Sequence, residues 1–275
     1  MLSSRSRPSL CASLKPMIRG VLFDLDGVLY NGEDPIPGAA GAVERVRRSG
    51  VATLFVTNTT SRPRGALVEK LAKFGIRAAP EDILTPPVAA AAWIRDRGGG
   101  AAALFVPDGT RAEFAGLEAA DDEAVGYVVI GDLGAAWEYH RLNKAFRLLH
   151  GRPERCLVAL GLTRFWQSSD GANLDVAPFV AALECATGRT ATVMGKPSKE
   201  FFLQAASRMG LAPEELLMIG DDLRVDVLGA QRAGLRSALV RTGKFQPSDL
   251  DGDERPEWVL DSACDLPELL ANRDH

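Results

Sequence analysis

VLFDLDGVLY, residues 21–30, is an apolar run that contains two aspartates near its end, Asp24 and Asp26, with Gly27 directly after them. A continuous apolar run of this kind is typical of a parallel strand that is covered on both faces. Burying two neighbouring carboxylates is unfavourable unless a cation, a substrate or a raised pKa compensates for it. The alternative is a solvated turn after the strand, so the rest of the chain has to distinguish a site from a turn.

Short apolar runs alternate with helix-like segments from residue 20 onward. The runs predicted as buried strands are VLFDLD, VATLFVT, ILT, AALFVP, YVVIG, CLVALG, ATVMG, LLMIGD and SALVRT. Between them, residues 61–75 predict a helix that Ser61 caps, and residues 197–210 predict one that Ser198 caps and Gly210 ends. This alternation predicts an α/β fold with a doubly wound, Rossmann-like parallel sheet.

The distribution of polar strand ends predicts two domains. Every predicted strand that ends in chemically useful polar residues lies before about residue 60 or after about residue 190. We therefore expect a core domain of residues 18–85 and 191–275, with an α/β cap domain of residues 86–190 inserted between its halves. Residues 1–17 are rich in Ser and Arg and lack acidic residues, which predicts a disordered leader. A targeting peptide, or a true start at Met17, is the alternative.

The composition argues against several classes of function. A chain of 275 residues that is 46% hydrophobic and 25% charged is typical of a globular protein. Its net charge of −4 offers no basic surface for nucleic acid, and no apolar run approaches the ~20 residues of a membrane helix. The four cysteines are scattered, without a C-x-x-C pair, so neither zinc nor a disulfide framework is expected. This cysteine usage favours a reducing compartment, the cytoplasm.

Four predicted strand ends carry polar side chains that would face one crevice. In an open parallel sheet, ligands bind beyond the carboxyl ends of the strands. These ends supply Asp24 and Asp26, Thr57 and Asn58, Lys196, and finally Asp221, Asp222 and Asp226. Carboxylates and carbonyls without His or Cys favour a hard, oxygen-preferring ion such as Mg²⁺, which a substrate phosphate helps to hold.

The chemistry of this set is suited to a phosphoryl group. One carboxylate can attack phosphorus, and the side chain two positions along an extended strand points to the same side and can transfer protons. Thr57 offers a hydroxyl and Lys196 an ammonium to phosphate oxygens, while Gly27 leaves room for the phosphoryl group. Lys196 also precedes a predicted helix N-terminus, which favours an anion. A small phosphorylated substrate is therefore expected.

DLDGVLY, VTNTT, GKPS and GDDLRVD, in this order, resemble the four motifs of the haloacid dehalogenase superfamily of phosphotransferases. The long insertion between the second and third motifs is similar to the cap of subfamily IIA, which includes the bacterial NagD-type phosphatases. The resemblance implies that Asp24 is a nucleophile that becomes an aspartyl phosphate and that Asp26 is the general acid and base. It also implies that Thr57 and Lys196 bind phosphate, and we expect Asn58, beside Thr57, to contact the phosphate as well.

The same resemblance implies how Mg²⁺ is held. Its ligands would be the carboxylates of Asp24 and Asp221 and the backbone carbonyl of Asp26. Asp222 and Asp226 would either support these ligands without contacting the ion or orient Lys196, and both alternatives stay open. The resemblance further implies a homodimer to which the cap contributes contacts.

Parts of the second half, among them GANLDVAPFVAALECATG and VRTGKFQPSD, resemble a subgroup of this family that hydrolyses phospholysine, phosphohistidine and inorganic pyrophosphate. Members of that subgroup carry Ser at the position of Asp26. A P–N bond or a pyrophosphate leaves more easily than an alkoxide and demands less of a general acid. Asp26 therefore favours ordinary phosphomonoesters, and the phosphoramidate or pyrophosphate activity is the alternative.

The segment expected to select the substrate is GLTRFWQSSDGANLD, residues 161–175. Arg164, Phe165, Trp166 and Asp170 offer a charge, two flat surfaces and an acceptor for a polar or planar leaving group. The alternative is that the two aromatic side chains pack the cap and that Arg164 is a solvated charge.

Two other classes of protein share part of this residue set. A phosphoacceptor of the receiver type also combines acidic residues with Thr and Lys, but it spans only one moderate domain and has no use for Asp26 or a cap. A carbon–halogen dehalogenase uses a nucleophilic Asp without a metal, and Asp26 and the GDD cluster at 220–222 argue against it.

Overall fold

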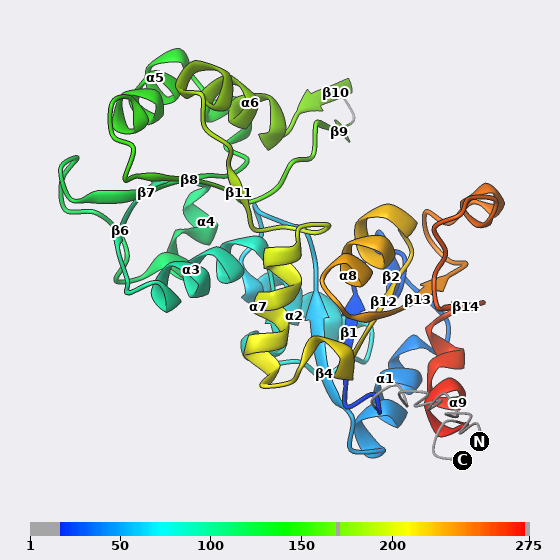
Figure 1. Ribbon diagram of the computed structural model, residues 1–275. Helices are drawn as coiled ribbons and strands as arrows, with labels where there is room; N and C mark the ends of the chain where they lie inside the picture. Colours follow the sequence, from blue (N-terminus) through cyan, green and yellow to red (C-terminus); the bar gives the residue numbers. More distant parts are fainter. Residues whose placement is uncertain (1–16, 169–170, 273–275) are drawn as a thin grey trace, which may run out of the picture.

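The computed structural model describes residues 17–168 and 171–272. It contains two larger sheets, each built of parallel strands and surrounded by helices (Figure 1). The predicted leader, residues 1–17, lies outside the described residues except for Met17, and so does Asp170. Within the described part of the chain, no helix has both the length and the apolar character needed to cross a membrane.

The larger sheet has six strands, each parallel to its neighbours, which confirms the predicted doubly wound α/β fold. In spatial order they are β14 (Trp258–Leu260), β13 (Arg236–Val240), β12 (Leu216–Gly220), β1 (Gly20–Asp24), β4 (Ala52–Val56) and β5 (Ile83–Leu84). The apolar run that contains Asp24 therefore supplies a central strand, which is flanked by β12 and β4.

Helices cover both faces of the larger sheet. On one face, Val21 and Phe23 of β1 pack in one core cluster with α1 (Ala39–Arg48), α2 (Arg64–Lys73) and α9 (Leu266–Ala271). On the other, Leu22 packs with α7 (Lys199–Met209) and α8 (Leu228–Arg232). Each fully buried large apolar side chain contributes about 1.5–3 kcal/mol, so two-sided burial holds the carboxyl end of β1 in place.

The predicted helix ends are correct for α7, whereas the predicted start of α2 is wrong. In α7, the Ser198 hydroxyl accepts a hydrogen bond from the N–H of Glu200 at 3.2 Å, and Gly210 ends the helix in the left-handed conformation. Ser61 does not cap α2, because the helix begins at Arg64 and an extended Pro63 occupies the N-cap position. A proline disfavours helical backbone at the residue before it, which is Arg62 here, and the helix therefore starts only after Pro63.

The smaller sheet has four parallel strands: β11 (Thr192–Val193), β8 (Cys156–Ala159), β7 (Val125–Ile130) and β6 (Ala101–Phe105). One face packs against α5 (Tyr139–Leu149) and α6 (Val176–Thr187), and the other against α3 (Pro86–Asp96). β11 belongs to this sheet, two residues beyond the boundary expected at residue 190. The segment that contains Lys196 therefore leads out of the smaller sheet into the helix α7 of the larger one.

Several contacts join the two sheet layers. α3 serves both, since Val88 packs in the core of the larger sheet and Ala90 in that of the smaller. The Arg64 guanidinium donates to both carboxylate oxygens of Glu113, at 2.8 and 2.7 Å, and Glu113 lies just beyond α4 (Asp108–Arg111). These contacts connect the helices of the larger sheet to the inserted segment.

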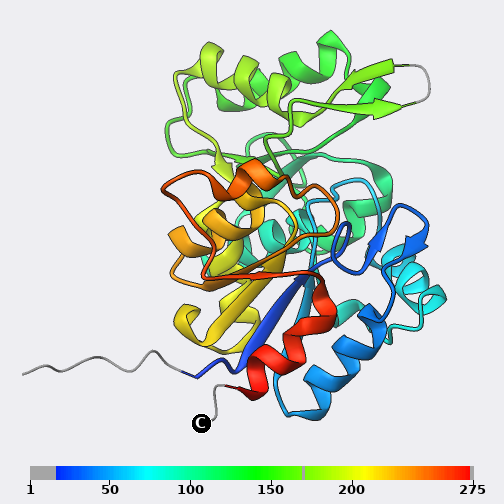
Figure 2. The ribbon, with the colours of Figure 1, turned by 90° about the vertical axis from the view of Figure 1, so that its right-hand side faces the viewer.

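Two hairpins complete the fold. β2 (Tyr30–Asn31) pairs with β3 (Asp34–Pro35), and β9 (Phe165–Ser168) pairs antiparallel with β10 (Gly171–Leu174). The second hairpin extends to one side of the smaller sheet, as the two views show (Figures 1 and 2).

Candidate active site

The carboxyl end of β1 carries Asp24, which is only 9% exposed. The backbone N–H of Leu25 donates to Asp24 Oδ1 at 2.8 Å, and the chain then turns sharply, with Gly27 N–H bonded to the carbonyl of Tyr30 at 2.7 Å. Asp26 is exposed on this turn. The structure therefore separates the two aspartates of the motif into one buried and one solvent-accessible carboxylate.

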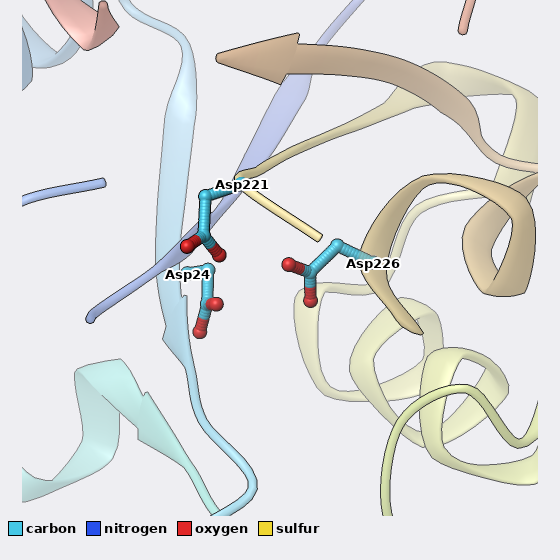
Figure 3. A group of neighbouring side chains, drawn as sticks. All are labelled: Asp24, Asp221 and Asp226. Atoms are coloured by element: carbon cyan, nitrogen blue, oxygen red, sulfur yellow. The ribbon is translucent and has the colours of Figure 1, made fainter. Parts of the chain in front are cut away.

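Lys196 lies between two buried carboxylates. Its Nζ is 2.7 Å from Asp24 Oδ1 and 2.7 Å from Asp226 Oδ1, and its side chain is 3% exposed. Oxygens of Asp24, Asp221 and Asp226 lie within 4.8 Å of one another. Figure 3 shows these three carboxyl groups gathered together. Three carboxylates thus gather in a buried site with one ammonium, which contacts two of them, and this arrangement favours an additional cation.

Asp221 has one occupied and one free oxygen. Its Oδ2 accepts a hydrogen bond from the backbone N–H of Lys244 at 2.7 Å, whereas the buried Oδ1 has no partner among the described residues. Gly27 lies against this carboxylate, because a Cβ at position 27 would come within 2.0 Å of Asp221 Oδ2. The side of Gly27 that a Cβ would occupy is therefore filled by Asp221.

Asp222 and Asp226 make different contacts. Asp222 Oδ1 accepts hydrogen bonds from the N–H groups of Arg224 and Val225, at 3.1 and 3.0 Å, and so caps the π-helical turn Leu223–Val227. Asp226 is fully buried, contacts Lys196 through Oδ1 and accepts from the N–H of Asp222 through Oδ2 at 3.2 Å. Asp222 therefore shapes the turn that delivers Asp226 to Lys196.

The electrostatic environment favours proton retention on the carboxylates. Burial raises the pKa of Asp24 and of Asp226, and it raises the pKa of Asp221 to about 6. Burial alone would lower the pKa of Lys196, but the carboxylates of Asp226 and Asp24 outweigh this effect and raise it. Lys196 is therefore charged at neutral pH, and its one positive charge faces three carboxyl groups.

Thr57 and Asn58 follow β4, the neighbour of β1. The Thr57 hydroxyl accepts a hydrogen bond from the N–H of Thr59 at 3.3 Å. The Asn58 side chain faces Lys196: its Nδ2 donates to the Lys196 carbonyl and its Oδ1 accepts from the Lys196 N–H, both at 2.8 Å. Asn58 was expected at the phosphate, but the structure uses both of its polar atoms to hold the main chain of Lys196.

Arg164 and Trp166 were expected to contact the substrate, and both belong to an exposed part of the chain. Both side chains are exposed beside or on the hairpin β9–β10, Trp166 to 43%. Among the described residues, no hydrogen bond or ion pair joins either to the acidic group. Among the described residues, Trp166 is absent from both core clusters of the smaller sheet, which argues against the packing alternative for this side chain.

The segment Thr242–Lys244, after β13, was not predicted as part of the site. The Thr242 hydroxyl donates to the carbonyl of Gly27, and the Lys244 N–H bonds to Asp221. One sequence signal could have indicated it, because SALVRT ends at the same edge of the sheet as the other polar strand ends and Gly243 follows it.

Two family models match this chain. The one for haloacid dehalogenase-like hydrolases matches residues 21–119, and one described as HAD-hydrolase-like matches residues 193–266. The chain is 40% identical over 258 residues to phospholysine phosphohistidine inorganic pyrophosphate phosphatase of Bos taurus, with 92% of this chain and 94% of that protein covered.

Two further proteins extend the comparison. Haloacid dehalogenase-like hydrolase domain-containing protein 2 of Bos taurus is 42% identical over 235 residues, which covers 85% of this chain and 88% of that protein. Among solved structures, p-nitrophenyl phosphatase from Archaeoglobus fulgidus superimposes with a TM-score of 0.82 at 28% identity, covering 92% of this chain and 100% of that one.

Proposed function

The chain belongs to the haloacid dehalogenase-like hydrolase family, and on that basis we propose that it is a Mg²⁺-dependent phosphatase of small phosphorylated metabolites. The observation that carries the proposal is the group formed by Asp24, at the end of the central strand β1, with Asp221 and Asp226, in which Lys196 contacts Asp24 and Asp226. The phosphatase names of its relatives support the reaction class.

Asp24 is the proposed nucleophile. Its Oδ1 is held by Leu25 and Lys196, while its Oδ2 accepts no hydrogen bond from a described residue. Attack by Oδ2 forms a new O–P bond and breaks the bond from phosphorus to the leaving oxygen, which gives an aspartyl phosphate. The exposed carboxyl group of Asp26 donates the proton that the leaving oxygen needs, and then takes a proton from the water that hydrolyses the intermediate.

Mg²⁺ fits the donor set by its chemistry. The free, buried Oδ1 of Asp221 needs a partner, and three carboxylates against one ammonium leave negative charge uncompensated. Asp24 and Asp221 would hold the ion, with the backbone carbonyl of Asp26, and it would neutralise charge on the phosphoryl oxygens. Asp226 orients Lys196, and Asp222 supports the turn behind it.

Thr57 and Lys196 are the proposed contacts for the phosphoryl oxygens. The Thr57 hydroxyl follows the strand next to β1, and the Lys196 ammonium already contacts the nucleophile. A positive group that touches Asp24 is well placed to stabilise charge developing on the transferred group. Arg164 and Trp166 are proposed to contact the leaving group from the hairpin.

A second candidate substrate class has its own support. The relative with 40% identity is named for phospholysine, phosphohistidine and inorganic pyrophosphate, so P–N bonds and pyrophosphate belong in the substrate panel. A phosphoacceptor that takes up phosphate without turnover is the remaining alternative for the same carboxylate group.

Compartment and assembly are further proposals. The free thiols of Cys156 and Cys185 are exposed, which supports a reducing compartment such as the cytoplasm. A homodimer with contacts from the inserted segment stays a prediction.

The test is phosphate release by the wild type and by Asp24→Asn, with Mg²⁺ and with EDTA. The panel holds p-nitrophenyl phosphate, sugar phosphates, nucleoside monophosphates, phosphoglycolate, pyrophosphate and phospholysine. We expect turnover only in the wild type with Mg²⁺, and the ranking of substrates separates esters from phosphoramidates. Phosphate uptake without release would favour the phosphoacceptor, and no reaction with any compound would contradict the phosphatase.

A further inference from the structure

The turn Thr242–Lys244 fastens two parts of the site that come from opposite ends of the chain. The Thr242 hydroxyl donates to the carbonyl of Gly27, 215 residues away in the sequence. Two residues later, the N–H of Lys244 donates to Asp221 Oδ2 at 2.7 Å. One short segment after β13 therefore bonds to both the turn after β1 and the carboxylate after β12.

Gly243, between these two bonds, lies directly against the carboxylate. Its φ is +64°, and a Cβ there would come within 2.1 Å of Asp221 Oδ2 and within 2.6 Å of Gly27 Cα. Real Cβ atoms do not approach other heavy atoms so closely, so any side chain at 243 would displace the Asp221 carboxylate or the Gly27 backbone. The absence of a side chain is a steric requirement of this contact.

The consequence for Asp221 is a fixed orientation. Gly27 and Gly243 both pack against Oδ2, and the Lys244 N–H occupies the same oxygen. Rotation of the carboxylate would break that hydrogen bond inside a nearly closed site, since Asp221 is 2% exposed. The other oxygen, Oδ1, is left buried and without a hydrogen-bond partner among the described residues.

We propose that the turn Thr242–Lys244 orients Asp221 for metal binding and that Gly243 is a positioning residue for Mg²⁺. The inference rests on the proposed function, because it presumes that Asp221 is a ligand. Groups that orient a metal ligand typically change metal affinity by about 10- to 100-fold when they are altered. The turn itself need not contact the ion.

The experiment compares Gly243→Ala with Gly210→Ala. Gly210, which ends α7, has a φ of +63° and no neighbour within 4 Å of a Cβ. Both variants therefore carry the same backbone strain, and only Gly243→Ala pushes against Asp221. The readout is the Kd for Mg²⁺ itself, obtained from the rise in Tm of metal-free protein titrated with MgCl₂, together with the Mg²⁺ dependence of phosphate release.

We expect Gly243→Ala to weaken Mg²⁺ binding by about 10- to 100-fold and Gly210→Ala to bind it like the wild type, although both lower the Tm without metal. Thr242→Val, which removes only the hydroxyl bond to Gly27, should weaken Mg²⁺ binding in the same direction, and it carries the test if Gly243→Ala does not fold.

Two outcomes would overturn the inference, and they are distinguishable. If the wild type binds Mg²⁺ and both turn variants bind it as tightly as Gly210→Ala does, the turn does not position Asp221, while the phosphatase proposal stands. If the wild type neither binds Mg²⁺ nor releases phosphate from any substrate, the proposed function fails and this inference fails with it.

Discussion

Asn58 holds the main chain of Lys196 through both polar atoms of its side chain, with two hydrogen bonds of 2.8 Å across 138 residues of sequence. Lys196 needs this support because it is not on a strand of the larger sheet. It lies between β11 of the smaller sheet and α7, on a segment that crosses from one layer to the other. Asn58 attaches that segment to the end of β4.

Asn58→Ala is therefore expected to lower turnover more than substrate binding. It leaves the Lys196 N–H and C=O without partners, at a cost of about 1–3 kcal/mol, and loosens the ammonium beside Asp24. Small displacements at a reacting centre cost up to about 100-fold in rate, so we expect kcat to fall about 10- to 100-fold. Steady-state kinetics and urea unfolding measure the two effects.

Asn58→Asp is the matched variant for this prediction. It keeps the acceptor for the Lys196 N–H but places a carboxylate against the Lys196 carbonyl, so it should be at least as damaging as Ala. Full kcat in either variant would show that Lys196 holds its place without Asn58.

Lys196→Met should destabilise the metal-free protein strongly. The ammonium is the shared partner of Asp24 and Asp226, and removing one member of a buried ion pair costs about 3–5 kcal/mol. The exposed Lys199→Met is the control, for which we expect a change within about 0.5 kcal/mol. Urea unfolding at neutral pH in EDTA gives both values, and equal effects at the two positions would contradict a structural role of the buried ammonium.

The pKa of Asp221 predicts a pH dependence of stability in the metal-free protein. Burial raises this pKa from 3.8 to about 6 in the folded state. The folded state therefore binds the proton more tightly than the unfolded state, so this contribution is complete below pH 3.8 and is lost as the pH rises through about 6. The loss amounts to about 2–3 kcal/mol.

The difference in unfolding free energy between the wild type and Asp221→Asn isolates this contribution. In EDTA, we expect the wild type to lose stability relative to the variant as the pH rises through about 6. With Mg²⁺, which binds the ionised form, the sign should reverse. A difference that stays constant with pH would mean that Asp221 is not the titrating group.

Asp26→Asn should separate substrates by their leaving groups. The side chain is exposed, so we expect little change in stability, within about 0.5 kcal/mol. Loss of a general acid typically costs about 10²- to 10⁴-fold. Alkyl phosphates should suffer most, and p-nitrophenyl phosphate least, because nitrophenolate leaves without a proton. An equal loss of kcat for both kinds of ester would argue against the general-acid role.

Trp166→Ala and Arg164→Met test the hairpin. Both side chains are exposed, Trp166 to 43%, so neither change should alter the Tm much. If they contact the leaving group, KM should rise for substrates with planar or anionic leaving groups and stay the same for small ones. A fall in Tm with unchanged KM would instead assign Trp166 to packing.

The sequence by itself determined the fold class and the edge of the sheet at which polar residues gather. Runs such as VLFD are apolar at every position because a parallel strand is covered on both faces, and Val21 and Leu22 indeed face opposite core clusters. Since parallel strands end at one edge, the order of polar strand ends was enough to bring Asp24 and Asp221 together. Local signals also placed both ends of α7.

Only the tertiary structure decided which atoms of these residues contact one another. Asn58 turned from an expected phosphate contact to a support of Lys196, and Gly27 proved to be packed against Asp221, because each contact joins segments that lie far apart in the chain. The close approach of Gly243 to Asp221 has no periodic signature in the sequence. Periodicity and turn residues encode local conformation, whereas the bonding of a particular carboxylate oxygen depends on how distant segments pack.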